Sequence, residues 1–317
     1  MVVVLLAGVG VVGLIGSRLV STSRTAEPGY DGYRPGQPRS GTEPGTEPTA
    51  EPSGPGTPTT TDRPTAAPRT TASTTTPPRA IPVAALGDHP INSGDRALPA
   101  VTCTLPRFSQ DAAGQDRFYR AGVPCLDAAW SPLLTAANLP SGSPAVETVT
   151  GAVSTPCGAQ PAERTAFYCP GNNTIYMTAA FYSERFGARP GQYLAVLAHE
   201  YGHHVQGITG IFDAYWDRRY EAGPTSEAGL ELSRRLELQA SCYAGMFVTS
   251  SGGRGSVDRN ITGEMVFALG NGGDDTVPGL PRDHGTVANN ARWADQGSRY
   301  NLAWQCNTWL ADTASVG

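Results

Sequence analysis

A sharp change in composition divides this chain of 317 residues and limits which part of it can fold. Across residues 41–79 the only aliphatic side chains are those of Ala, and Thr, Pro, Ser and Gly dominate residues 21–80. Such a segment buries too little apolar surface to offset the entropy lost on ordering. We therefore predict an extended, disordered linker at 21–80 and one globular domain at 81–317, which is long enough for a sizeable core.

The first residues form an apolar run. Residues 1–17 contain no charged side chain, and Arg18 and Arg24 follow. About 20 apolar residues cross a bilayer, so a run over 1–20 is just long enough to be a membrane anchor. A cleaved secretory signal is the alternative, but no basic stretch precedes the apolar core, so we favour the anchor. In both cases the domain is exported.

Charge and cysteine content narrow the function classes. The formal net charge is −5 and all 23 basic residues are Arg, which argues against nucleic-acid binding because that requires a basic face. Six Cys in an exported chain indicate three disulfides, with fifteen pairings open. No C-x2-C pair occurs, which disfavours a Cys-ligated zinc.

Hydrophobic periodicity predicts an α+β domain. We expect a helix over 110–138, either continuous or broken near Pro124, and strands at 146–153 and 167–177, the second with a turn at 170–173. Further helices are expected at 179–186, 193–206 and 227–248. Strands followed by helices are typical of the α+β class.

The helix predicted at 193–206 carries the pattern His-Glu-x-x-His, at His199, Glu200 and His203. Four residues advance a helix by about 400° and 6 Å, so both imidazoles lie on one face and can reach one zinc ion. Glu200 is then placed to hold a metal-bound water and accept its proton. We expect Gly202 to reduce bulk beside the site and Gly207 to end the helix.

A catalytic zinc needs a third protein ligand and an open position for water. Gln206 and Thr209 stand where a longer motif would place Gly and a third His, so the ligand must come from elsewhere. Glu237 borders the apolar stripe of the helix predicted at 227–248, where an unpaired carboxylate would be costly to bury. Glu231 is a weaker candidate, and a pairing of Glu237 with an arginine such as Arg234 is the alternative to a ligand role.

Several segments together resemble the neutral zinc metallopeptidases of bacteria. They are HEYGHHVQ at 199–206, RLELQASCYAG at 235–245, HGT at 284–286 and QCNTW at 305–309, with FYCPGNNTIYM at 167–177 upstream. The resemblance covers roughly 103–309. It implies a zincin-like peptidase fold, one Zn²⁺ bound by His199, His203 and Glu237, and Glu200 as the catalytic acid and base. It also implies a peptide or protein substrate.

One position departs from the family pattern. The family usually has Asp four residues after the ligand Glu, and this chain has Ser241. An Asp there would orient a ligand imidazole through its ring N–H, whereas Ser accepts that hydrogen bond without a charge. Loss of such a partner typically lowers metal affinity or activity about 10–100-fold.

Other residues receive narrower expectations. His284 is the best remaining catalytic candidate, as a donor to the negative charge that develops on a carbonyl oxygen, with a structural hydrogen bond as the alternative. The strand at 173–177 is a candidate edge for pairing with an extended substrate. Tyr201 and Tyr243 are weaker alternatives for the role of His284 and are expected to pack. His204 is expected to support the ligands or to pack, with a ligand role as the alternative. Asp274 and Asp275 are expected in a solvated turn.

For the disulfides we favour two specific pairs. Cys157–Cys169 would flank a strand connection, and Cys242–Cys306 would tie the helix of Glu237 to the C-terminal segment. Cys103–Cys125 then remains as the third pair.

These observations lead to two hypotheses. The first is a membrane-tethered zinc endopeptidase in a single-pass bacterial membrane protein, with its domain outside the cytoplasm, or secreted after signal cleavage. The second is a catalytically weak or inactive zinc-binding scaffold of the cell envelope. Glu200 favours the enzyme, because a purely structural zinc site has no need of that base.

Overall fold

The computed structural model describes residues 86–162, 164–275, 279 and 281–317. The predicted apolar segment 1–20 and linker 21–80 lie outside these residues. Within the described part of the chain, no helix is both long and apolar enough to cross a bilayer. The described residues form a mixture of helices and small sheets, consistent with the α+β class.

Helix α1, Ala112–Ala136, confirms the helix expected over 110–138 ahead of the strands. The Asp111 side chain caps its first turn by accepting the N–H of Gly114. The helix continues through Pro124 and Pro132 without a break. Its apolar face packs against β1 and α3.

The main sheet has three strands: β1 (Ala145–Val149), β4 (Phe167–Cys169) and β5 (Thr174–Thr178). Their order is β1-β5-β4, with β1 parallel and β4 antiparallel to β5. The predicted second strand is therefore a hairpin of β4 and β5, joined by the expected turn. Because β5 pairs on both sides, the prediction that 173–177 is a free edge is wrong.

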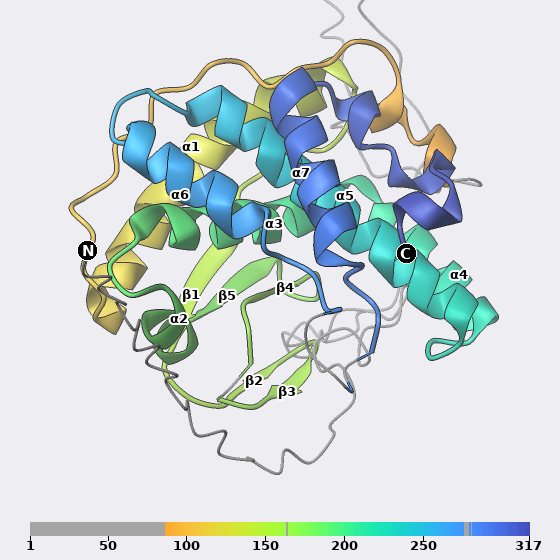
Figure 1. The fold of residues 1–317 in the computed structure, drawn as a ribbon, viewed down its shortest axis with the longest axis horizontal. Coiled ribbons are helices and arrows are strands. Elements are labelled where there is room, and N and C mark those ends of the chain that lie inside the picture. Colours follow the sequence, from red (N-terminus) through yellow and green to blue (C-terminus); the bar gives the residue numbers. More distant parts are fainter. Residues whose placement is uncertain (1–85, 163, 276–278, 280) are drawn as a thin grey trace, which may run out of the picture.

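A separate hairpin of β2 (Val153–Thr155) and β3 (Gly158–Gln160) lies at the lower edge of Figure 1. The other helices are α2 (Ala179–Phe186), α3 (Pro190–Thr209), α4 (Ile211–Ala222), α5 (Glu227–Ser251), α6 (Arg259–Leu269) and α7 (Val287–Tyr300). Short 3-10 turns occur at Leu86–Asp88, Pro90–Asn92, Ala303–Cys306, Thr308–Leu310 and Thr313–Ser315. Sequence periodicity did not predict α4, α6, α7 or the β2–β3 hairpin.

Helix α3 runs past Gly207, so the expectation that this glycine ends the helix is wrong. The helix ends before Gly210, whose φ of 88° is left-handed and suits glycine. A Cβ on Gly207 would lie 2.8 Å from the Tyr168 ring, so this glycine lets β4 approach the helix. Gly202 has a similar role, because its Cβ would lie 3.0 Å from the Cα of Ala240 on α5.

Helix α5 packs against both α3 and α7 and lies across the middle of the domain (Figure 1). The three disulfides have the pairing favoured from the sequence: Cys103–Cys125, Cys157–Cys169 and Cys242–Cys306. The last of these ties α5 to the C-terminal segment. Together these contacts hold α3 and α5 side by side along the stretch that carries the candidate ligands.

Candidate metal centre

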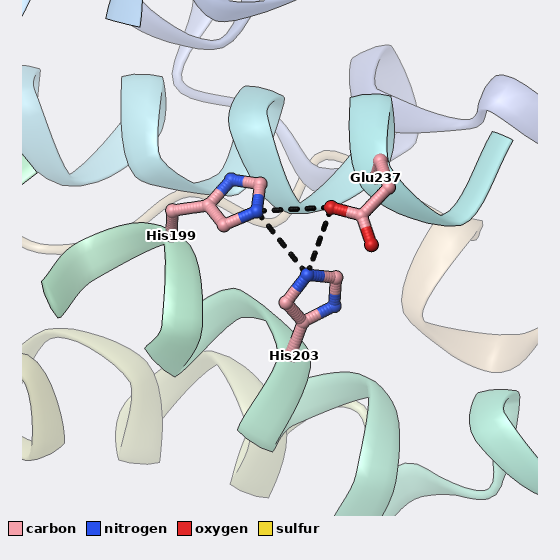
Figure 2. Close-up of side chains that lie close together, drawn as sticks. All are labelled: His199, His203 and Glu237. Carbon is pink, nitrogen blue, oxygen red and sulfur yellow. Dashed lines mark hydrogen bonds and ion pairs between the residues drawn. The ribbon is translucent and has the colours of Figure 1, made fainter. Parts of the chain in front are cut away.

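Three side chains from two helices converge on one point (Figure 2). His199 and His203 project from α3, and Glu237 projects from α5. Glu237 Oε2 lies 3.1 Å from Nε2 of each histidine, and the two Nε2 atoms lie 3.2 Å apart. Sequence spacing predicted the histidine pair, and the position of Glu237 beside the apolar stripe of its helix favoured it as the third ligand, in agreement with the resemblance.

The spacing of these donors fits a zinc ion. Tetrahedral zinc with bonds of about 2.0 Å separates its ligand atoms by about 3.3 Å. Two imidazole nitrogens and one carboxylate oxygen, 3.1–3.2 Å apart, therefore match three corners of such a site. The same donor types occur in catalytic zinc sites that keep one position for water.

The other ring nitrogen of His203 is held by Gln206. Nδ1 of His203 lies 2.8 Å from Gln206 Oε1, while Gln206 Nε2 donates to the Leu236 carbonyl and to Gln239 Oε1. Those donations orient Oε1 toward the imidazole, which fixes the proton on Nδ1 and directs the lone pair of Nε2 toward His199 and Glu237 at the centre. Gln206, which rules out the longer three-histidine motif, is thus itself a support of the site.

Ser241, which replaces the family's usual Asp, belongs to a chain of hydrogen bonds. The chain runs from His199 through Ser241 and Asn290 to the Leu269 carbonyl. The Asn290 amide nitrogen donates to the Leu269 carbonyl, and its Oδ1 accepts the Ser241 hydroxyl at 2.6 Å. Ser241 Oγ lies 3.2 Å from His199 Nδ1. Since a carbonyl only accepts, the chain has one direction, with His199 Nδ1–H donating to Ser241 and Nε2 facing the centre. No sequence pattern marked Asn290.

The charges at the centre suit a cation. Burial would raise the pKa of the Glu237 carboxyl, but His203, His284 and the hydrogen bonds from the ligand imidazoles hold it well below its usual value. Burial would lower the pKa of His203, but the Glu237 carboxylate outweighs burial and raises it to about 9. An anionic carboxylate between two imidazoles therefore attracts positive charge to this point.

The structure supports neither Glu231 as the third ligand nor an ion pair between Glu237 and Arg234. Arg234 pairs with Glu227 and donates to the Arg282 carbonyl, so it does not neutralise Glu237. Glu231 pairs with Arg235 at 2.7 Å. Glu237 is thus the carboxylate of α5 that faces the histidines.

Glu200 and His284 line the same cleft as the three donors. The Glu200 carboxyl is buried, and burial raises its pKa above the usual value. His284 Nε2 lies 3.8 Å from Glu237 Oε2, and its Nδ1 lies 2.6 Å from an Asp283 carboxylate oxygen. The structure therefore brings both sequence candidates to the centre.

Asp274 corrects the expectation of a solvated turn. Its side chain is buried, accepts the backbone N–H of His284 at 2.9 Å and contacts Arg282 Nε at 3.0 Å. Asp275 is exposed, as expected, and accepts the N–H of Val287 at the start of α7. Asp274 therefore positions the segment that carries His284.

The other aromatic candidates pack, as expected. The Tyr201 hydroxyl donates to Asp127, and the Tyr243 ring meets Trp130 edge to face with centroids 4.9 Å apart. His204 is held between Asn173 Oδ1 and the Gly142 carbonyl, each at 2.7 Å, and burial lowers its pKa to about 4. None of these three side chains joins the cluster of metal donors.

The donors lie in a cleft of about 600 Å³. Residues of α2, α3, α5 and α6 line it, together with the segment before β4 and the one before α7. The cleft is large enough to hold several residues of a peptide beside the metal site.

Comparison with known proteins agrees with this geometry. A family model described as "Putative neutral zinc metallopeptidase" matches residues 107–309. The uncharacterized protein Rv2575 of Mycobacterium tuberculosis is 33% identical over 175 residues, 52% of this chain and 55% of the relative. The uncharacterized protein YpfJ of Escherichia coli K12 is 32% identical over 171 residues, 50% of this chain and 58% of the relative.

The chain spans little more than half the length of these curated relatives. No solved structure matches it. The family model covers more than half of the chain, including the candidate ligands and the disulfide between α5 and the C-terminal segment. The chain therefore belongs to this zinc metallopeptidase family.

Proposed function

We propose that the chain is a zinc-dependent endopeptidase with a zincin-like fold. The observation that carries the proposal is the convergence of His199, His203 and Glu237 at 3.1–3.2 Å, the spacing of three zinc ligands. Family membership supports the choice of zinc and of a peptide or protein substrate. When bound, zinc supplies the Lewis acidity that makes water a nucleophile near neutral pH.

Glu200 acts as the base and then as the acid. Its carboxylate accepts the proton of the attacking water and delivers it to the nitrogen of the departing amine. The raised pKa of the buried carboxyl suits both roles, because it brings proton uptake and release closer to neutral pH. No acyl-enzyme forms in this mechanism, since water is the nucleophile.

His284 stabilises the negative charge that develops on the substrate oxygen. Its Nδ1 lies 2.6 Å from an Asp283 carboxylate oxygen, and Asp274 accepts its backbone N–H, so both residues orient the ring. A fixed donor of this kind contributes a few kcal/mol to catalysis.

We further propose that the enzyme acts outside the cytoplasm of a bacterium. The three disulfides support this location, because such bonds persist in oxidising compartments. The apolar segment at 1–20 would tether it to the membrane or direct its secretion.

The test measures bound zinc and cleavage of unfolded casein by the full chain. Wild type is expected to hold one zinc ion and to cleave. Glu200→Gln should keep zinc and lose about 10²–10⁴-fold in cleavage rate. Glu237→Ala should lose both. Glu231→Gln is the matched control, since this carboxylate lies on the same helix but pairs with Arg235, and it should keep both.

Zinc bound by wild type without any cleavage would favour a binding scaffold instead. Equal cleavage by wild type and Glu200→Gln would contradict the proposed mechanism.

A further inference from the structure

The cleft has an uneven distribution of charge. Its lining includes three arginines, Arg164, Arg185 and Arg189. Among the described residues, the only carboxylates that line it are Glu200 and Glu237, both at the metal centre. A chain with a formal charge of −5 thus presents a basic wall beside its candidate active site.

Two of these arginines stack on aromatic rings. The guanidinium carbon of Arg185 lies 5.0 Å from the centroid of the Phe181 ring, and that of Arg164 lies 4.8 Å from the Phe167 ring. The stack on Phe181 leaves the planar edge of N–H donors of Arg185 directed away from the ring, where it can meet a carboxylate. Phe181 and Phe167 line the cleft as well, so the stacks belong to its wall.

Arg185 and Arg189 form no ion pair with any residue in the described ranges. Other arginines outside the cleft do pair with carboxylates: Arg120, Arg234, Arg235, Arg282 and Arg299. The charges of Arg185 and Arg189 are therefore available to a ligand in the cleft.

The arginines extend away from the metal centre. One face of α3 lines the cleft through Gln192, Val196, His199 and His203. Arg189, just before this helix, is about ten residues from His199, which corresponds to about 15 Å along the axis. An extended peptide covers that distance with about four or five residues. Arg164 lies in the segment before β4, and its charge acts on the Glu200 carboxyl.

We propose that this cleft selects extended peptides with acidic side chains within about five residues of the bond to be cleaved. Arg185 and Arg189 bind these carboxylates at the end of the cleft formed by α2 and the start of α3. The statement about cleavage rests on the proposed function, whereas the selectivity of binding does not.

The experiment measures binding with the zinc-loaded full chain carrying Glu200→Gln, which should not hydrolyse the probe. Fluorescent extended peptides that differ only in having Asp, Asn or Lys at the same positions are titrated and followed by anisotropy. The Asp peptide is expected to bind about tenfold more tightly than the Asn peptide, and the Lys peptide most weakly. The preference should shrink as salt is added.

Two further variants test whether Arg185 and Arg189 cause the preference for the Asp peptide. Adding Arg185→Gln and Arg189→Gln should reduce it to about twofold or less. The matched control is Arg292→Gln, an exposed arginine of α7 outside the cleft, which should leave it unchanged. A preference that survives the double substitution would show that peptide carboxylates bind elsewhere, for example at the metal, and would overturn the proposal.

Equal binding of the Asp and Asn peptides would also overturn it. Cleavage of casein by wild type is scored separately. Selective binding of the Asp peptide without cleavage of casein would contradict the proposed enzyme but support the proposed selectivity. Cleavage of casein without selective binding would support the enzyme and contradict the selectivity.

Discussion

The helices that hold the candidate ligands and the outer strand cluster are packed in different ways. In the helices, glycines meet backbone atoms directly. A Cβ on Gly245 would lie 2.0 Å from the Ala294 carbonyl oxygen, and one on Gly297 would lie 1.9 Å from that of Cys242. The outer cluster near the β2–β3 hairpin has a core of only Cys157, Phe167, Cys169 and Tyr176.

This difference shows which contacts stabilise the metal donors and which stabilise the cleft wall. The metal donors come from α3 and α5, and α5 is packed closely against α3 at Gly202 and against α7 at Gly245 and Gly297. The outer cluster supplies part of the cleft wall through Phe167 and depends on a disulfide and one aromatic stack, with Tyr176 at 4.9 Å. The metal donors and the part of the cleft wall at Phe167 therefore rest on separately stabilised parts.

The largest effect on stability is expected from removing one disulfide in each of the two regions. Replacing both cysteines of Cys242–Cys306, which are 64 residues apart, should lower the free energy of unfolding by about 4 kcal/mol. Removing Cys157–Cys169, which spans 12 residues, should cost about 3 kcal/mol, because its loop is shorter. Urea unfolding at fixed zinc concentration measures both. A larger loss from the short loop would contradict the comparison.

A pair of glycine substitutions tests the packing directly. Gly297→Ala should lower the free energy of unfolding by about 3 kcal/mol, because the new methyl group meets the backbone of α5. Gly151→Ala, in the strand-bearing part, has no atom within 4 Å of its new Cβ and should change stability by less than about 0.5 kcal/mol. Thermal unfolding of both variants measures the difference. Similar midpoints would show that α5 and α7 can separate without cost.

Asn290 tests whether α7 supports the metal centre. Asn290→Ala removes the acceptor that orients Ser241 toward His199, so zinc affinity should fall about tenfold. Competition with a chromophoric chelator measures this affinity, and circular dichroism checks that the fold is retained. Phe181→Ala alters the cleft wall away from the ligands and should leave zinc affinity unchanged. Equal losses from both variants would mean that the effect is not specific to the hydrogen-bond chain.

His89 gives a smaller, pH-dependent effect at the end of α3. Its Nε2 lies 3.0 Å from the Thr209 carbonyl oxygen, while Nδ1 accepts the Ile91 N–H, so the folded state holds the neutral ring. Burial lowers the pKa of His89 below 6.5, although the hydrogen bond to Thr209 opposes this. The unfolded chain therefore binds the proton first, and the stabilisation present above pH 6.5 is lost as the pH falls through the lowered pKa.

The check is urea unfolding of wild type and His89→Gln between pH 8 and pH 4. Wild type should lose its advantage over the variant as the solution is acidified. An advantage that grows on acidification would reverse the assigned sign.

Predictions from the sequence were accurate where they depended on neighbouring residues. The helices at 179–186 and around 193–206, and the turn between β4 and β5, follow from local periodicity and turn residues. The predictions about Gly207 and the strand at 173–177 were wrong because both depend on distant segments. The role of Gly207 is set by Tyr168, and that of the strand at 173–177 by its pairing with β1.

The sequence by itself determined the histidine pair, because helical spacing places residues four apart on one face whatever surrounds them, and it placed Glu200 next to the first histidine. The apolar stripe of α5 indicated Glu237, which the resemblance supported, and the resemblance drew attention to His284. Only the tertiary structure decided that Ser241 is linked to Asn290, 49 residues away, and that arginines line the cleft beside the centre. Hydrogen-bond partners and cleft walls come from segments that folding brings together, and a periodic pattern within one element carries no information about them.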